Sequence, residues 1–160
     1  MPVTIRGSGQ IVVQVASITK TDVFTTTSAS YVDVTGLSVT ITPTSASNRI
    51  LITGLVNFGA ATDTGFFRLV RDSTAICVGN AAGSRIQATA QQRNSPDSAD
   101  AEAASVNFLD SPNTTSAVTY KIQGCCNGTN TVRFNSSADD ADQTNRGRTA
   151  STITVMEISG

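Results

Sequence analysis

Apolar and polar side chains alternate along the stretch from Tyr31 to Asn57, and this alternation constrains the fold more than any other feature of the sequence. Apolar residues recur at every second position on both sides of Gly36, which is the period of a strand with one buried and one solvated face. Pro43 and the polar residues 44–48 interrupt the pattern before it resumes at Ile50. We therefore expect two long strands that either fold back on each other or cross between two sheets through a surface loop.

The rest of the chain repeats this pattern in shorter segments. Further strands are predicted at 11–18, 65–71, 74–78, 85–90, 105–109, 116–123, 131–134 and 149–158, and residues 19–30 have room for a short edge strand. The turn residues Asp72-Ser73 predict one hairpin, and the turn Asp110–Asn113 predicts a second. Residues 91–104 are expected to form an exposed loop. Eight to ten short strands without a convincing helix predict an all-β fold, an antiparallel β-sandwich of the jelly-roll type.

Two of the predicted strands are apolar on both faces. Residues 11–18 carry valines on both faces, so this strand is expected to be covered on both sides, with another copy of the chain as one candidate cover. The last strand, residues 149–158, has the same character. We expect it to lie inside a sheet and not at an edge.

The chain has the length of one domain, at 160 residues. Residues 1–10 precede the first predicted strand, and Gly7-Ser8-Gly9 makes a flexible joint within them. We therefore divide the chain into an N-terminal arm, residues 1–10, and a jelly-roll domain, residues 11–160. The arm is expected to pack on a neighbouring subunit or on a larger assembly.

Charge and hydropathy exclude several classes of partner. The 11 Lys and Arg residues are scattered and the net charge is -1, so nucleic acid is not an expected partner. No run of 18 apolar residues is present, and residues 1–10 lack the apolar core of a signal peptide, so a membrane is not an expected partner either. Charged residues make up only 14%, and a surface covered by hydroxyl groups is common in extracellular and virion β-proteins.

The sequence contains no histidine, which removes Ser-His-Asp and Cys-His nucleophile systems and the commonest metal ligand. Two groups of carboxylates remain, namely Asp139, Asp140 and Asp142, and Asp97, Asp100 and Glu102. Either group has oxygen ligands for calcium or an acid–base pair for a glycosidase. Both groups lie in long polar loops, where solvated charge is the simpler explanation. We therefore expect no metal, no cofactor and no enzymatic activity.

The three cysteines, Cys77, Cys125 and Cys126, do not form a disulfide framework, because their number is odd. Adjacent Cys125 and Cys126 point to opposite faces of a strand, so the alternatives are one bond to Cys77 or three buried thiols in a reducing compartment, which we favour. Phe66 and Phe67 are also adjacent. They cannot both point inward from a regular strand, so one of them is predicted to contact another subunit.

Four segments cover most of residues 19–158: TKTDVFTTTSASYVDVTGLSVTITPTSASNRILI, FRLVRDSTAICVG, VNFLDSPNTTSAVTYKIQ and STITVMEI. Taken in this order, they resemble a widespread family of bacteriophage virion proteins. Its members are C-terminal modules of tail-fibre proteins and small capsid-associated proteins. The same strand pattern is similar to trimeric jelly rolls of the tumour-necrosis-factor and C1q type, in which three sandwiches pack about a threefold axis.

The resemblance implies a homotrimeric structural protein on the exterior of a phage particle, made in the cytoplasm of a bacterial host. The short arm, with no fibre shaft, favours a decoration or cement protein that binds the major capsid protein or other virion proteins. The alternative is the tip of a tail fibre or head fibre, whose loops 91–104 and 135–148 bind a glycan or protein on the host surface. The residues expected at the interfaces are Val3, Ile5, Arg6, Val12, Val13, Phe66, Phe67 and Tyr120.

Overall fold

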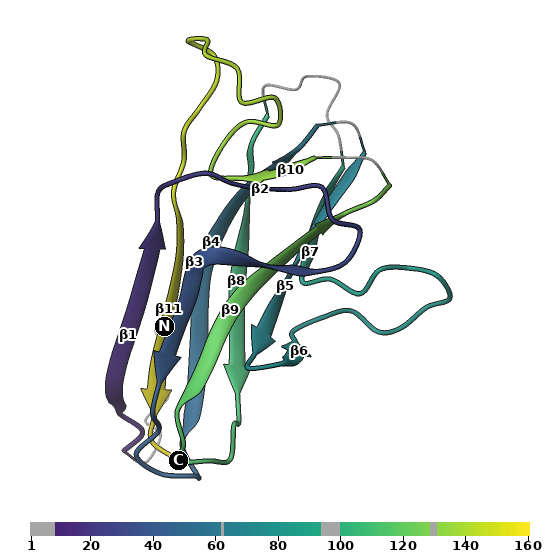
Figure 1. The fold of residues 1–160 in the computed structure, drawn as a ribbon. Coiled ribbons are helices and arrows are strands. Elements are labelled where there is room, and N and C mark those ends of the chain that lie inside the picture. The colour runs from purple at the N-terminus through teal and green to yellow at the C-terminus, as the bar shows by residue number, and fades with distance from the viewer. Residues whose placement is uncertain (1–8, 62, 94–99, 129–130) are drawn as a thin grey trace, which may run out of the picture.

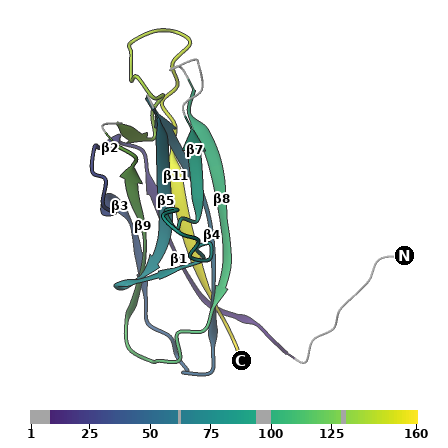
Figure 2. The same cartoon turned by 90° about the vertical axis from the view of Figure 1, so that its right-hand side faces the viewer.

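The computed structural model describes residues 9–61, 63–93, 100–128 and 131–160, which contain eleven strands and no helix. The strands form two sheets, antiparallel throughout, that pack face to face as a jelly-roll-like sandwich (Figure 1). Figure 2 shows the two layers from the side, with β3 and β9 in one layer and β4 and β8 in the other. The predicted all-β sandwich is confirmed, with one strand more than the expected eight to ten.

Sheet A is the larger layer. Its strands are β1 (Val12–Lys20), β2 (Phe24–Thr26), β4 (Arg49–Ala60), β8 (Glu102–Asp110), β10 (Val132–Phe134) and β11 (Ser151–Ile158). Strand β8 lies along one side of β4, while β11 and then β10 share its other side. Strand β1 pairs with β11 and β2 pairs with β10. The last strand is therefore internal to the sheet, as its apolar character predicts.

A buried polar network lies where β11 stops pairing with β4 and β10 begins to pair with it. The backbone N–H of Asn57 donates to Ser151 Oγ at 2.9 Å, and its side-chain amide donates to the carbonyl of Ala150 at 2.6 Å. Ser151 Oγ donates in turn to Asn135 Oδ1 at 2.6 Å, and Asn135 Nδ2 donates to the carbonyl of Lys20 at 2.9 Å. These side chains satisfy backbone groups that lose their ladder partners where the strands part.

Sheet B is the smaller layer. It contains β3 (Val32–Ile41), β5 (Thr64–Arg71), β6 (Thr74–Ile76), β7 (Ala90–Arg93) and β9 (Val118–Cys126). The order is β3-β9-β5-β6, with β7 beside the first half of β5. The predicted hairpin at Asp72-Ser73 is confirmed as β5–β6. Asp72 has φ of 54°, a left-handed conformation that aspartate tolerates better than most residues do.

Six of the ten connections between the described strands cross from one sheet to the other, and two of them test predictions made from the sequence. Strands β3 and β4 belong to different sheets, so the second of the two arrangements expected for Tyr31–Asn57 is the one present. The second predicted hairpin is wrong: β8 pairs with β4, whereas β9 pairs with β3 and β5. The connection after Asp110, in which Asn113 has a left-handed φ of 52°, carries the chain from one layer to the other. Turn residues indicate that the chain changes direction, but they do not determine which strand the next strand pairs with.

The region after β6 also differs from the prediction. Residues 85–89 are not a strand, and β7 occupies Ala90–Arg93 instead. Strand β8 already begins at Glu102, so both ends of the predicted exposed loop 91–104 are paired with other strands, while residues 94–99 lie outside the described part. Strand β7 could not be recognised in the sequence, because Gln91, Gln92 and Arg93 show no alternation of apolar and polar side chains.

The core between the sheets is built on three phenylalanines. Phe58 of β4 meets Phe67 of β5 edge to face, with ring centroids 5.3 Å apart, and stacks on Phe134 of β10 at 5.8 Å. All three side chains are buried. Within the described residues, no helix has the length and apolar character needed to cross a bilayer.

Candidate functional site

The three aromatic residues predicted at an interface are buried within one chain. Phe67 lies in the core against Phe58, and Phe66, on the opposite face of β5, is only 8% exposed. The two rings thus point to opposite faces of β5, as expected, but Phe66 is covered by its own chain, so contact of this ring with another subunit stays a prediction. Tyr120 is fully buried, and its hydroxyl donates to Asp110 Oδ2 at 2.7 Å. These side chains offer little surface to a second protein.

Val12 and Val13, by contrast, are exposed on β1, which is an edge strand of sheet A. Ile11, just before the strand, and Val15 within it are exposed as well, at 63% and 57%. The apolar edge is thus longer than the two predicted valines. The other predicted interface residues, Val3, Ile5 and Arg6, lie outside the described residues.

Exposed apolar side chains continue from β1 across the outer face of sheet A. Val15 is paired with Met156 of β11, Met156 with Leu51 of β4, and Leu51 with Leu109 of β8. Residues that are directly opposite in register point to the same face of a sheet. These four residues, which we call the apolar row, therefore run side by side across four strands on the face turned away from the core.

The chain concentrates its exposed large apolar side chains on this sheet. Those found among the described residues are Ile11, Val12, Val13, Val15, Leu55, Ile86 and Leu109. All except Ile86 belong to strands of sheet A or directly precede β1. The sequence signal for the row is the occurrence of apolar residues at both odd and even positions in 50–52 and 155–158.

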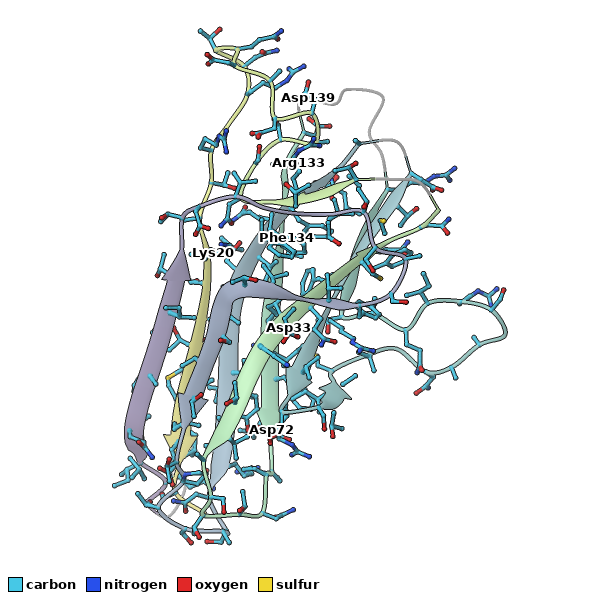
Figure 3. The ribbon with its side chains drawn as sticks, in the orientation of Figure 1. Lys20, Asp33, Asp72, Arg133, Phe134 and Asp139 are labelled. Carbon is cyan, nitrogen blue, oxygen red and sulfur yellow. The ribbon has the colours of Figure 1, made fainter. Side chains whose placement is uncertain are left out.

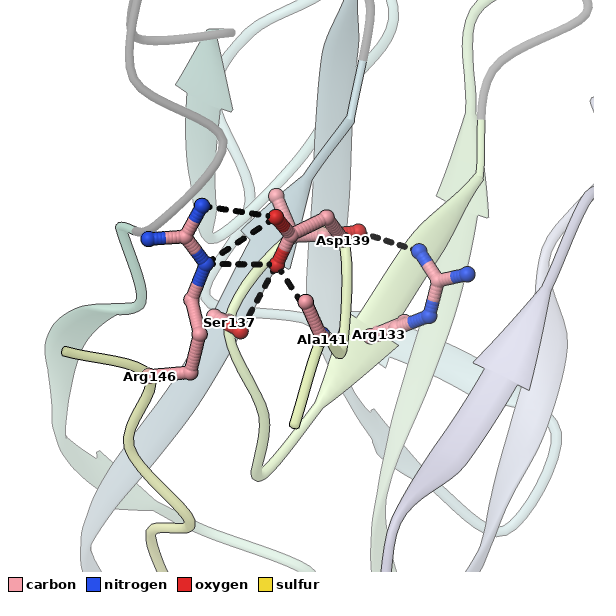
Figure 4. A network of polar contacts seen from close by, with 6 residues as sticks. Arg133, Ser137, Asp139, Ala141 and Arg146 are labelled. Carbon is pink, nitrogen blue, oxygen red and sulfur yellow. Dashed lines mark hydrogen bonds and ion pairs between the residues drawn. The ribbon is translucent and has the colours of Figure 1, made fainter. Parts of the chain in front are cut away.

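The loop of residues 135–150 projects from one end of the sandwich and carries the predicted carboxylates (Figure 3). Asp139 accepts two hydrogen bonds at 3.0 Å from Arg146 Nε and is also bonded by Ser137 and the N–H of Ala141 (Figure 4). Asp140 pairs with Arg148 at 2.9 Å. Arg146 and Arg148 are thus both engaged with carboxylates of their own loop.

This loop also forms a polar hollow of about 320 Å³. Its lining includes Asp140, Asp142, Gln143, Arg146 and Arg148. Among the described residues, no three Cys, Asp or Glu side chains come together as metal ligands would. Asp100 and Glu102 belong to the other predicted group, and Asp97 lies outside the described residues. The carboxylates, guanidinium groups and amide that line the hollow are groups that form hydrogen bonds with a polar surface.

At the opposite end of the sandwich, Glu157 is a fully buried carboxylate on an inward position of β11. It accepts hydrogen bonds from Gln14 Nε2 at 2.6 Å, Asn48 Nδ2 at 2.6 Å, and the N–H and hydroxyl of Thr44 at 2.7 and 2.9 Å. Burial by itself raises the pKa of this carboxyl, but the bonds from Asn48, Gln14 and Thr44 together lower the pKa to about 2. Sequence reasoning missed this network, because its members come from three distant segments.

The three cysteines are free thiols. Cys126 lies in the core, and Cys125 lies beside Tyr31, consistent with opposite faces of β9. Burial raises the pKa of all three thiols, so they are poor nucleophiles. Cys125 and Cys126 are buried as expected, whereas Cys77 is only partly buried, and the reducing compartment stays a prediction.

No protein-family model matches this sequence, and no curated protein sequence matches it. Among solved structures, this chain is similar to a chain in the structure of infectious bursal disease virus, Gx strain. The sequence identity is 13% and the TM-score 0.43, and the match covers 94% of this chain and 40% of the viral chain. It is similar to the Gt strain with the same identity and TM-score over 91% and 40%. The VP2 subviral particle of that virus gives 13% identity and a TM-score of 0.38 over 91% and 39%. The chain spans about two fifths of each of these viral chains, and likenesses this distant do not define its activity.

Proposed function

We propose that this chain is a non-enzymatic structural protein of a bacteriophage virion, a homotrimer that decorates or cements the exterior of the capsid. The observation that supports this proposal best is the exposed apolar edge at the start of β1, formed by Ile11, Val12 and Val13. Exposed apolar surface on this scale marks contact with another protein. The arm, residues 1–10, directly precedes this edge in the sequence, so the arm and β1 make one continuous attachment segment to the major capsid protein.

Cementing has a physical meaning in this proposal. A trimer presents three attachment segments, and each binds weakly to a different neighbouring capsid subunit. Because the three contacts are linked, separating the subunits breaks several contacts at once, and the assembly is stabilised by more than a single contact supplies.

The test is to count copies of the chain in purified particles of the phage that encodes it. We expect gel densitometry to give a copy number comparable to that of the major capsid protein. A protein that is missing from the particle overturns the proposal. Rebinding to stripped particles then maps the contact: the double substitution Val12→Glu and Val13→Glu is expected to abolish rebinding, whereas Ser84→Glu, in the exposed β6–β7 loop, leaves it unchanged.

A second candidate function is the tip of a tail fibre or head fibre that binds a host surface glycan, and the polar hollow in loop 135–150 favours it. Carboxylates, guanidinium groups and an amide converge there, and these groups hydrogen-bond sugar hydroxyls. This function predicts a copy number far below that of the major capsid protein. It also predicts binding to polysaccharide from the host surface that Asp142→Ala and Gln143→Ala weaken and that Thr40→Ala, on sheet B, does not.

A further inference from the structure

The two outer faces of the sandwich differ in charge. On sheet B, Asp33 accepts from Lys121 Nζ at 2.8 Å and from Gln123 Nε2 at 2.7 Å. Arg68 Nε donates to Gln123 Oε1 at 2.9 Å, and its guanidinium lies 4.0 Å from the ring centroid of Tyr31. Charged groups with satisfied partners are what a permanently solvated face carries.

The outer face of sheet A has no such groups among its central residues. Beside the apolar row lies a second row, in which paired residues are Ser17, Thr154, Thr53 and Asn107, and a third row, Thr19, Thr152, Leu55 and Ser105. The hydroxyls of Ser17 and Thr154 bond to each other at 2.8 Å. None of the residues in these three rows of four is charged. The face therefore needs no counter-ions from water or from a partner.

The size of this face suits a protein contact. Four strands spaced by about 4.8 Å, and three rows about 6.8 Å apart along them, give a flat area of roughly 400 Å². Two such areas bury roughly 800 Å², which is in the range of weak, reversible protein contacts.

We propose that the outer face of sheet A is covered by a second copy of the same chain. Copies of one chain carry identical charges, so a surface that binds its own kind must avoid like-charge contact, and a face without charge does so in any rotational alignment. The outer face of sheet B would instead bring Lys121 and Arg68 near their counterparts. A contact between two identical faces relates the copies by a twofold axis. This proposal therefore goes beyond the threefold packing of the proposed function, and it rests on that function only for the setting of the assembly.

The experiment measures the mass of the purified full-length chain by sedimentation, without any phage particle. We expect the wild-type protein to be an oligomer whose population rises with concentration, because the contact is small. Leu51→Glu places a charge at the centre of the face and is expected to give a monomer, since each contact then buries an unpaired carboxylate. Thr40→Glu, the matched change on the outer face of sheet B, is expected to keep the wild-type mass.

A second substitution guards against misfolding. Leu51 is partly buried, so Leu51→Glu could unfold the protein, which a loss of the β-sheet circular dichroism signal would reveal. In that case Leu109→Glu, at a position that is 43% exposed, replaces it in the mass measurement. Met156, in the apolar row, gives an independent readout: peroxide is expected to oxidise its sulfur several-fold faster in the Leu109→Glu monomer than in the wild-type oligomer.

Two outcomes overturn the proposal: a wild-type protein that is monomeric at every concentration, or an oligomer whose mass and Met156 oxidation rate survive both substitutions. A wild-type dimer that Leu109→Glu dissociates supports this contact and contradicts the homotrimer. A chain that is missing from the virion contradicts the proposed function but leaves the mass measurement standing. The failures of the two proposals are therefore distinguishable.

Discussion

At the scale of single residues, Glu157 shows how the fold accommodates a buried charge without a cationic partner among the described residues. The donors to its carboxylate come from Gln14 on β1 and from Thr44 and Asn48 in the β3–β4 connection. Asn48 also accepts from the N–H of Gly160 at 3.0 Å, which ties down the end of the chain. Hydrogen bonds to an ionised group are stronger than neutral ones, and four of them replace the water that burial removes.

This network predicts an acid-labile fold. The folded-state pKa of Glu157, about 2, lies below the usual value of 4.5, so its ionised form stabilises the fold fully above pH 4.5, and this contribution is lost as pH falls toward 2. The difference corresponds to about 3 kcal/mol of unfolding free energy. We expect Glu157→Gln to lower the unfolding free energy at pH 7 by about 2 kcal/mol. The NH2 group of the glutamine can only donate hydrogen bonds, and the groups around it are donors as well.

Urea unfolding at several pH values between 7 and 2 checks this prediction. The substituted protein is expected to show a shallower loss of stability below pH 4.5 than the wild type. Glu102→Gln, at an exposed position of β8, removes an equal charge and is expected to leave the pH slope as it is. Equal slopes for wild type and Glu157→Gln mean that another group controls the acid response.

At the scale of elements, the two sheets are in tight contact where Gly124 of β9 faces Phe134 of β10. A Cβ added to Gly124 would lie 2.6 Å from Phe134, whose ring is held between Phe24 and Phe58. The ring cannot move aside, so Gly124→Ala is expected to destabilise the fold by about 1–3 kcal/mol through overpacking. Gly79→Ala, where a Cβ meets nothing within 4 Å, is the matched control and is expected to change the unfolding free energy by less than about 0.5 kcal/mol.

Chemical denaturation of Gly124→Ala and Gly79→Ala measures the change in unfolding free energy that each substitution causes. If Gly124→Ala is as stable as Gly79→Ala, then β9 and β10 have room to separate and the packing of Phe134 is not a constraint on the fold. A loss of stability confined to Gly124→Ala indicates that the absence of a side chain at this position is a requirement of the sandwich.

Strands with a regular apolar period could be predicted from the sequence, and their partners could not. The alternation around Gly36 located β3, and Asp72-Ser73 located the β5–β6 hairpin, because both signals are local. Strand β7 carries glutamines and arginine and gave no signal. The pairing of β8 with β4 depends on side-chain packing with residues about fifty positions away, which no local turn encodes. For the same reason the apolar row became visible only after β1, β11, β4 and β8 were placed side by side.

At the scale of the whole molecule, one ion pair connects the two layers near the end of β8. Asp110 belongs to sheet A, and both of its oxygens accept from Arg71 Nη1 of sheet B at 2.9 Å. Tyr120, which is paired with Arg71 in register, donates its hydroxyl to the same carboxylate. Burial and the neighbouring Asp110 carboxylate raise the pKa of Tyr120, so its hydroxyl stays protonated and remains a donor. The β8–β9 connection, which was predicted to be a hairpin, thus begins at a tie between the sheets, namely the ion pair of Arg71 and Asp110.

This tie gives a prediction about how the layers hold together. Asp110→Leu leaves the partly buried Arg71 without a counter-ion and Tyr120 without an acceptor, so we expect it to lower the unfolding free energy by about 3 kcal/mol. Adding Arg71→Leu removes the unpaired charge and lets two apolar side chains meet across the layers, so the double variant is expected to be more stable than Asp110→Leu alone. Denaturant unfolding of both single variants, the double variant and Tyr120→Phe measures the coupling, with Tyr120→Phe expected to cost about 1–2 kcal/mol. If the losses of the two single variants simply add in the double variant, the pair does not act as a unit, and apolar packing alone holds the sheets in register at this end.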